Sequence, residues 1–444
     1  MKPTAESSAR HQSLNLPLYQ DTNYPAMHLN YLSLTNFRNY ARLELSLPGR
    51  LTVIQGANGQ GKTNLLEAIH LLATGRSPRA TVERELIAWL ALDGPLPYAR
   101  LTGDIGEGRA AEKLELVLEL AANGGANGPT VRKQVRINGA PKRGIDLVGH
   151  LRVVLFLPED INLVAGAPSE RRRYLDIALC QISSTYCRAL GEYNRVVTQR
   201  NALLRRLRDE GGDAGQLNFW DTHLAEHGST LLHRRGTAVG ALDRIAAERH
   251  GALTGGAERL HLGYLPSPDP AATAHESPRQ TDAARKLRLA EGRPAYGAVT
   301  RESIQEGLLG QLRAARSRDI AAGSCLVGPH RDDMAFTVDG HDLRAFGSRG
   351  QQRTAALALK LAELQLMRDE TGESPLLLLD DVMSELDAAR RQTVLAALAS
   401  VEQAIVTTTD WGDFSAELLG QARTLRVDRG SLAEDKQTCQ ALET

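Results

Sequence analysis

Aromatic side chains are scarce in this sequence, because only 4% of its 444 residues are Phe, Trp or Tyr. Any folded core must therefore rely on leucine, valine, isoleucine and alanine. Basic and acidic residues balance at 53 each, so the overall charge points to no particular partner. With 42% apolar and 24% charged residues, the composition is that of a globular protein long enough for two or three domains.

Metal-type cysteine spacings and long apolar runs are also lacking. The four cysteines form no CxxC pair, and we expect reduced thiols of a cytoplasmic protein at Cys180, Cys187, Cys325 and Cys439. No stretch reaches the roughly 18 apolar residues that a transmembrane helix needs, so we expect no membrane partner. Residues 1–26 are polar and lack the apolar segment of a secretory signal, and we expect a disordered extension there.

The hydrophobic periodicity divides the chain into two α/β parts separated by a helical part. Strand-like alternation from Met27 gives way to helical spacing at about residue 166, and a proline-rich stretch near 263–282 predicts a linker. Buried runs at 376–379 and 404–406, joined by a helix pattern, predict parallel strands covered on both faces. The expected units are an extension (1–26), a first α/β part (27–165), a helical lobe (166–322), a second α/β part (323–427) and a tail (428–444).

A glycine-rich stretch, GANGQGKTN at 56–64, follows the short strand pattern LTVIQ and fits G-x-x-x-x-G-K-[ST]. Glycines let backbone N–H groups approach phosphate oxygens, and the helix that begins at Lys62 adds its dipole. We predict that Lys62 reaches the β- and γ-phosphates of ATP and that Thr63 ligates Mg²⁺. The alternative is a chance glycine turn with a surface lysine. The predicted nucleotide-binding residues are Gly56, Ala57, Asn58, Gly59, Gln60, Gly61, Lys62, Thr63 and Asn64.

Two adjacent carboxylates, Asp380 and Asp381, follow a run of four leucines. Charged groups next to a core are costly unless a cation or hydrogen bonds compensate them. We therefore predict that Asp380 holds Mg²⁺ and that Asp381 orients or polarises the attacking water, which with Lys62 makes a catalytic site for ATP hydrolysis. The alternative is that the two aspartates cap the helix that follows.

A second glycine-containing helix start, SRGQQ at 348–352, precedes an amphipathic helix pattern. It resembles the signature motif of ABC-type ATPases, in the SxGQQR form of their chromosome-associated members. That resemblance implies that Ser348, Gly350 and Gln351 contact the γ-phosphate bound by a second copy of the chain, with Ser348 contributing to catalysis. ATP would thus join two copies into a homodimer. It also implies a D-loop at 384–387 and a switch position at 407–409, where threonines stand in place of the histidine of transporters.

Further motifs indicate which group of ABC-type ATPases the chain resembles. The segment between the P-loop and the signature is too long for a transporter ATPase, and it lacks the heptads of an SMC coiled coil. From Met27 to about Asp410 the chain resembles the RecF family, in NFRNY (36–40), FLPEDINLVAGAPSERRRYLD (156–176), GPHRDD (328–333), GSRGQQRT (347–354) and LLLLDDVMSELD (376–387). The resemblance implies an α/β fold: an ABC-type P-loop ATPase head, with mixed and parallel sheets and flanking helices, plus a mostly helical second lobe.

The RecF resemblance also implies a function. Members bind single-stranded DNA and gapped or junction duplexes, hydrolyse ATP weakly with stimulation by DNA, and have RecO and RecR as partners. They act in the SOS response and in recombinational repair of gaps and stalled replication forks, by helping to load the recombinase.

A basic segment supports DNA binding, since residues 170–208 hold nine arginines and three acids. We predict contacts with DNA phosphates at Arg171, Arg172, Arg205, Arg206 and Arg208. The alternatives are a solvated helix face and, for residues 171–173, a structural tie between lobe and head. In GPHRDD, His330 beside two aspartates suggests a metal, but a packing or turn role is favoured.

Three other functions stay open. One is an SMC-like or OLD-like ATP-gated regulator of chromosomes or nucleases. Another is a small-molecule kinase or transporter ATPase. The third is an ATP-controlled DNA clamp with negligible turnover.

Overall fold

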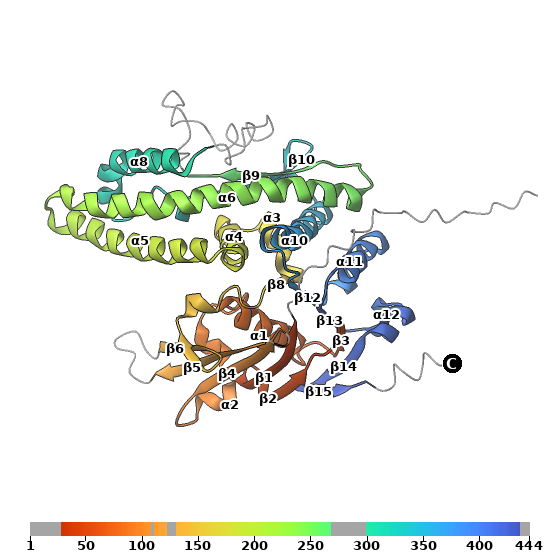
Figure 1. The fold of residues 1–444 in the computed structure, drawn as a ribbon. Coiled ribbons are helices and arrows are strands. Elements are labelled where there is room, and N and C mark those ends of the chain that lie inside the picture. Colours follow the sequence, from red (N-terminus) through yellow and green to blue (C-terminus); the bar gives the residue numbers. More distant parts are fainter. Residues whose placement is uncertain (1–27, 107, 109–110, 122–129, 268–298, 436–444) are drawn as a thin grey trace, which may run out of the picture.

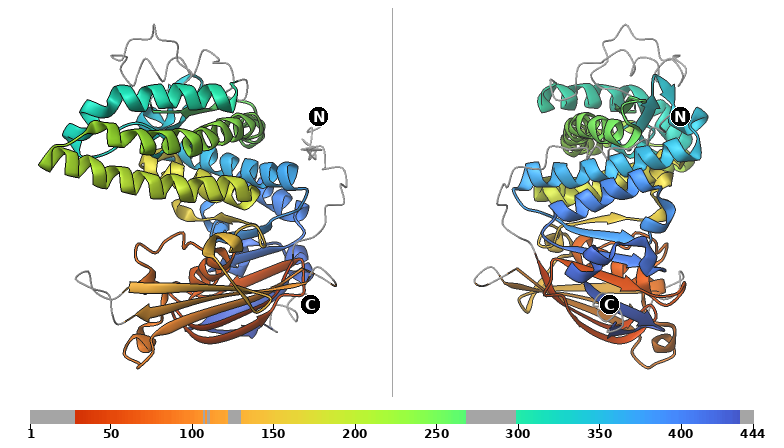
Figure 2. Two further views of the ribbon diagram at one scale, coloured as in Figure 1. Left: turned by 60° about the vertical axis from the view of Figure 1, so that its left-hand side comes forward. Right: turned by 90° about the vertical axis from the view of Figure 1, so that its right-hand side faces the viewer.

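The computed structural model describes residues 28–106, 108, 111–121, 130–267 and 299–435. The expected extension at 1–26 and most of the expected linker lie outside these residues. Two six-stranded sheets form the head, and long helices form the lobe that lies against it. The helices gather on one side of the molecule and the antiparallel strands lie at the opposite end (Figure 1, Figure 2).

The first sheet of the head is antiparallel, as the alternating sequence predicts. Its order is β2-β1-β4-β5-β6-β7. The predicted Asn138-Gly139 turn joins its last two strands, and both residues have positive φ, 52° and 79°. The strands are β1 (Leu29–Phe37), β2 (Tyr40–Ser46), β4 (Tyr98–Ile105), β5 (Glu112–Ala121), β6 (Thr130–Ile137) and β7 (Ala140–Lys142), with η1 (Glu83–Leu86) and α2 (Trp89–Leu92) before β4 and η4 (Gly144–Leu147) after β7.

The second sheet carries the nucleotide motifs. Its order is β15-β14-β3-β13-β12-β8, and all neighbours except β14 and β15 are parallel. The strand before the P-loop and the strand that ends in Asp380 therefore both border β13, and their carboxyl ends meet at one edge. The strands are β3 (Leu51–Gln55), β8 (Val153–Phe156), β12 (Leu376–Asp380), β13 (Ala404–Thr408), β14 (Arg423–Asp428) and β15 (Ser431–Glu434).

Helix α1 (Lys62–Thr74) lies between the two sheets of the head and contacts strands of both. Leu65, Leu66 and Ile69 are completely buried there, as their helical spacing predicts. Burying a helix on nearly every side fixes its position. The P-loop at its N-terminus is thereby held at the edge of the parallel sheet.

The lobe is built on three long helices, α5 (Ser184–Glu210), α6 (Leu217–Thr254) and α8 (Arg301–Ala322). Helix α10 (Arg349–Thr371) packs on α6 and contacts β8, so one hydrophobic core continues from the parallel sheet into the lobe. The remaining elements are η5 (Pro158–Ile161), α3 (Asn162–Ala165), α4 (Pro168–Ile182), η6 (Ala214–Gln216), β9 (Leu260–Leu265), η8 (Pro329–Arg331), β10 (Asp333–Val338), β11 (His341–Asp342), α9 (Leu343–Phe346), η9 (Met383–Glu385), α11 (Ala388–Ser400), η10 (Trp411–Asp413) and α12 (Ala416–Gln421).

Three expected boundaries differ from the structure. Residues 263–265 belong to β9 rather than to a linker, because β10 pairs with β9 from about seventy residues farther along the chain. The sheet β11-β10-β9 packs on α6, so residues 333–342 lie with the lobe rather than with the second α/β part. Residues 431–434, expected in the tail, form β15, which makes a hairpin with β14 at the edge of the head sheet. The first two differences come from strand pairing across a long sequence separation, which local periodicity does not reveal.

Candidate nucleotide and DNA sites

The P-loop has the backbone that phosphate binding requires. Gly59 and Gly61 have φ values of 79° and 119°, which favour glycine. A Cβ atom at Gly61 would lie 2.5 Å from the Asn39 side-chain amide nitrogen and 3.0 Å from the Tyr40 hydroxyl oxygen. Residues 57–59 are exposed and α1 begins directly after the loop, so the backbone N–H groups at the helix start are open to an anion.

Residues from outside the motif hold the loop in this shape. The Tyr40 hydroxyl donates to the Gly61 carbonyl at 2.9 Å, and Asn39 accepts a hydrogen bond from Asn64 at 2.9 Å. The backbone N–H of Arg429 donates to the Gln60 side-chain oxygen at 2.7 Å. Gln60 and Asn64 therefore brace the loop with side-chain groups. Sequence reasoning missed the role of Arg429, which lies in the expected tail.

Lys62 is 5% exposed, and its ammonium group donates to the backbone carbonyls of Gly56 and Ala57. Burial lowers the pKa of Lys62, while the negative charges of Asp381 and Asp380 act in the opposite direction. A buried ammonium held only by carbonyl groups is under-compensated. Lys62 is thus suited to bind phosphate oxygens.

Asp380 ends β12 and is 5% exposed. Its carboxylate accepts hydrogen bonds from the hydroxyls of Thr63 and Thr407, the latter at 2.8 Å, and burial raises its pKa. A threonine hydroxyl and a carboxylate side by side are oxygen ligands of the kind that Mg²⁺ takes at phosphate sites. The residues present therefore fit the expected metal ion.

Asp381 has a backbone φ of 51°, an uncommon value for a residue other than glycine. Burial raises its pKa, and Lys62 opposes that shift. One of its carboxylate oxygens, Oδ1, is buried and has no hydrogen-bond partner among the described residues. Asp387, not the Asp380–Asp381 pair, caps α11 by accepting from the Arg390 N–H at 2.9 Å. The capping alternative is therefore wrong.

The threonines at the expected switch position point inward. Thr407 and Thr408 are completely buried; Thr407 donates to Asp380, and Thr408 donates to Asp413 at 2.8 Å. Thr407 thus orients the predicted metal ligand from the neighbouring strand. A second residue that sequence reasoning missed is Arg79, whose positive charge lowers the pKa of Asp380.

The predicted signature begins α10. Ser348 and Gln351 form a capping box, in which the Ser348 hydroxyl accepts from the Gln351 N–H at 3.2 Å and the Gln351 side chain accepts from the Ser348 N–H at 2.9 Å. Gln351 also donates to Glu258 of the lobe at 2.9 Å. Ser348 is exposed, and Phe346 beside it is 79% exposed. The signature therefore presents a helix N-terminus and an apolar side chain to the outside.

The arginine run divides into buried and exposed members. Arg171 is 2% exposed and pairs with Asp333 at 2.6 Å, so the prediction that it contacts DNA is wrong. Arg172 donates to the Asp332 carbonyl at 2.7 Å, and Arg173 donates to the Ser77 carbonyl of the head. The Arg173 bond ties the lobe to the head, whereas the partners of Arg171 and Arg172 lie with the lobe. Arg205, Arg206 and Arg208 are exposed at the end of α5, and their assignment to DNA stays a prediction.

GPHRDD forms the turn that starts β10. Gly328 has a φ of 124°, and His330 shares a hydrogen bond with the Tyr193 hydroxyl at 2.8 Å. Asp332 is 1% exposed and accepts from the Ser267 N–H at 2.8 Å and from the Tyr264 hydroxyl. These bonds support the packing role for the motif.

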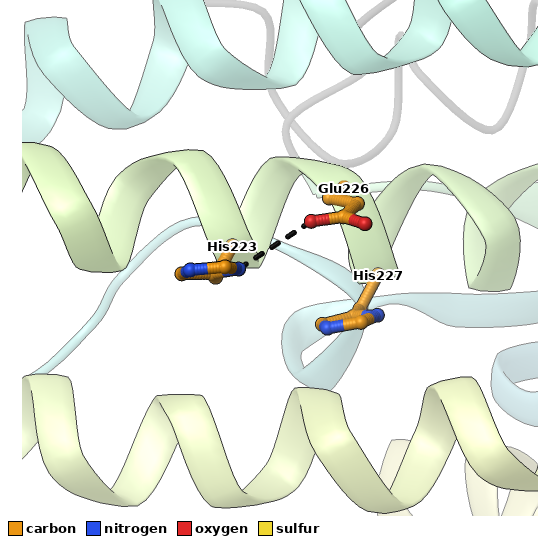
Figure 3. Close-up of side chains that lie close together, drawn as sticks. All are labelled: His223, Glu226 and His227. Atoms are coloured by element: carbon orange, nitrogen blue, oxygen red, sulfur yellow. Dashed lines mark ion pairs between the residues drawn. The ribbon is translucent and has the colours of Figure 1, made fainter.

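A separate cluster on α6 has metal-ligand chemistry. His223, Glu226 and His227 project from the same stretch of the helix, and their ligand atoms lie within 4.8 Å of one another (Figure 3). Histidines four residues apart on a helix can chelate a transition-metal ion. All three side chains are at least partly exposed, and His223 lies 3.4 Å from Glu226 as an ion pair. Exposed groups of this kind also occur without a metal, and the cluster lies on α6 of the lobe rather than among the residues of the nucleotide site.

Comparison with known proteins places these motifs in a family. The family described as RecF/RecN/SMC N terminal domain matches residues 28–423. The DNA replication and repair protein RecF of Chloroflexus aurantiacus is 43% identical over 417 residues, which cover 91% of this chain and 99% of the relative. That of Geobacillus thermodenitrificans is 38% identical over 412 residues, with 92% and 99% covered.

One solved structure is similar to this chain over nearly the whole length of the chain. It is described as the recombination mediator protein RecF-ATP in the RecFOR pathway, and it matches with a TM-score of 0.77 and 32% identity, covering 94% of this chain and 100% of the relative. Among the described residues, no helix has the length and apolarity to cross a membrane.

Proposed function

The chain belongs to the RecF family of DNA replication and repair proteins, and from this premise we propose that it is a cytoplasmic, ATP-controlled DNA-binding dimer with weak, DNA-stimulated ATPase activity. ATP binding closes two copies on DNA, and hydrolysis releases them. RecO and RecR act with it at single-strand gaps and stalled forks to load the recombinase. A solved relative described as part of the RecFOR pathway supports these partners.

One observation carries the nucleotide part of the proposal. Lys62 and Asp380 are buried charges and Asp381 is a partly buried one, and neither the lysine nor Asp381 is fully compensated among the described residues. Thr63 and Asp380 would hold Mg²⁺, which would supply charge neutralisation on the phosphates. Lys62 binds the terminal phosphate oxygens. The free oxygen of Asp381 orients the attacking water.

The place of the signature supports the dimer. Ser348 and Gln351 bond to each other and Gln351 bonds to the lobe, whereas Lys62 and Thr63 bond to the P-loop and β12. The exposed α10 N-terminus then serves an ATP molecule held by a second copy. Gln351 supports the Ser348 turn, and Gly350 keeps the approach to its amides open. Phe346 gives the dimer contact an apolar anchor.

DNA binding is assigned to exposed arginines of the lobe. Arg205, Arg206 and Arg208 project from the last turns of α5, and Arg172 lies nearer the head. Guanidinium groups bind backbone phosphates without reading bases. The binding is therefore sequence-neutral and salt-dependent.

Sedimentation velocity with ATP and Mg²⁺, with and without gapped DNA, tests the dimer. Ser348→Arg keeps ATP binding but prevents ATP-dependent dimerisation, because the side chain blocks the helix start. Ser415→Arg is the matched control, since Ser415 also caps a helix, α12, with its hydroxyl. A Ser348→Arg chain that dimerises like the wild type, or a Ser415→Arg chain that fails equally, would overturn the trans arrangement.

A further inference from the structure

A cavity of about 660 Å³ lies between the head and the lobe, away from the P-loop. The segment 75–86 and Lys133 of β6 line the cavity from the head, and α4, α5, α6 and η8 line it from the lobe. Figure 1 shows α4 between the long helices and the strands of the head. The volume falls within the range of about 300–1,000 Å³ that small-molecule sites occupy.

The side chains that line this cavity carry more positive than negative charge. Its two acids already have basic partners, because Glu83 pairs with Lys133, and Asp176 pairs with Arg235 at 2.7 Å. Three lining guanidinium groups form no ion pair among the described residues: Arg76, Arg172 and Arg173. The cavity therefore holds a surplus of positive charge.

The arginines also act on one another. Burial lowers the pKa of Arg172, and the charge of Arg235 lowers it further, while the carboxylates of Asp332, Asp333 and Asp176 act in the opposite direction. Burial likewise lowers the pKa of Arg173, with Arg76 as the second cause. Arg172 and Arg173 donate only to the backbone carbonyls of Asp332 and Ser77. An anion would relieve this repulsion with charge-assisted hydrogen bonds.

Apolar side chains also line the cavity, namely Leu86, Leu190 and the ring of Tyr193. A ligand with both phosphate groups and a flat apolar body fits this mixed lining. We propose that the cavity is a second anion site, which binds the phosphate groups of a nucleotide-sized ligand, supplied either as a free phosphate compound or as part of a DNA strand. This site goes beyond the ATP site of the proposed function.

The cavity is connected to the P-loop helix. Arg76 and Ser77 directly follow α1, which begins at Lys62, and the Ser77 hydroxyl donates to Glu67 of that helix. Arg173 holds Ser77 from the lobe side. A ligand that bridges Arg76 and Arg172 would thus join the end of the P-loop helix to the lobe.

Two probes test the site in a Lys62→Met background, where the P-loop is impaired. One is inorganic pyrophosphate, followed by calorimetry. The other is a labelled oligo(dT) of about 20 nucleotides, followed by anisotropy. Arg76→Gln should lower the binding affinity for at least one probe by about tenfold or more, and Arg76→Lys should restore part of the lost affinity. Arg84→Gln is the control, because Arg84 is exposed on the same segment but does not line the cavity.

The two probes separate the sources of the ligand. Loss of pyrophosphate binding assigns a free phosphate compound, and loss of oligo(dT) binding alone assigns a DNA strand. Equal binding of both probes by Arg76→Gln and its parent, or an equal loss in Arg84→Gln, would overturn the proposal. With Lys62 intact, Arg76→Gln should still dimerise with ATP, so a failure of the cavity proposal is distinct from a failure of the proposed function.

Discussion

The head and the lobe both bury charged side chains, but they compensate them differently. In the lobe, Arg200 is completely buried and pairs with Asp221 at 2.8 Å and Asp319 at 2.6 Å, which joins α5 to α6 and α8. In the head, Lys62 is held by backbone carbonyls, and Asp381 has a carboxylate oxygen without a partner among the described residues. Buried charge with its own counter-charge serves the fold, whereas buried charge without one is free to bind a ligand.

Replacing Lys62 gives the largest expected effect on activity and tests the head side of this contrast. Lys62→Met should reduce ATP hydrolysis by about a hundredfold or more, because it removes a donor to the transferring phosphate. Its free energy of unfolding should change little, because no carboxylate loses an ion pair. Turnover assays and urea denaturation measure the two quantities. ATP-dependent dimerisation at the wild-type level would contradict the P-loop assignment.

Arg200→Met is the corresponding test in the lobe. It should lower the free energy of unfolding by about 3–5 kcal/mol, since Asp319 and Asp221 lose a buried partner. Urea denaturation measures the loss, and ATP binding by the folded fraction should persist. Arg195→Met on the same helix is the control, because Arg195 is exposed and lies 3.9 Å from Glu192. If both variants lose the same free energy of unfolding, the buried Arg200 network contributes no more to stability than the exposed Arg195.

The predicted residues of the head site could be identified because they form local motifs, and their roles in ATP binding and hydrolysis stay predictions. The P-loop, the Asp380–Asp381 pair and the Ser348 cap each lie within a few consecutive residues, where spacing and residue type suffice. The supports of the site come from elsewhere: Thr407 reaches Asp380 across 27 positions, and Arg429 reaches Gln60 across 369. No local pattern marks such pairs.

The arginine run between residues 170 and 208 shows what local sequence patterns do not predict. Charge counts treat Arg171 like its exposed neighbours, yet its partner Asp333 stands 162 positions away and buries it. A run of like charges therefore predicts a basic segment but not which members face the solvent. The same holds for β9, whose partner strand β10 follows about seventy residues later.

Two buried histidines, one in the head and one in the lobe, should destabilise the protein over the same pH window. Burial lowers the pKa of His70 in the head and of His330 in the lobe to about 4, from 6.5. Between these values the unfolded chain binds protons that the folded chain excludes, so the histidine contribution to stability is full above pH 6.5 and falls by about 3 kcal/mol per histidine as the pH drops toward 4. Asp160 and Asp332 act in the opposite direction, because burial raises their pKa to about 6, from 3.8.

Urea denaturation at a series of pH values measures this effect. His330→Gln should remove the contribution of one of the two histidines from the profile, because Gln keeps polar groups near Tyr193 and Cys325 but does not titrate. His227→Gln is the control, since His227 is partly exposed on α6. An unchanged profile in His330→Gln would mean that His330 can be protonated in the folded state.

The smallest expected effect concerns the exposed arginines of α5, which neither bury charge nor lie near ATP. Replacing Arg205, Arg206 and Arg208 by Gln should reduce the salt slope of DNA binding by about 1–3 units, since each phosphate contact contributes about 0.9. The lower end is expected if Arg208, paired with Asp209 at 2.8 Å, keeps that partner.

Anisotropy at several salt concentrations measures the slope. The triple variant Arg84, Arg132 and Arg136 to Gln is the matched control, because it removes three exposed arginines from the head. An equal change of slope in both triple variants would show that the net charge, and not the end of α5, governs DNA binding. A change confined to the α5 variant would place the DNA on the lobe, on the far side of the buried Arg200 network from the head.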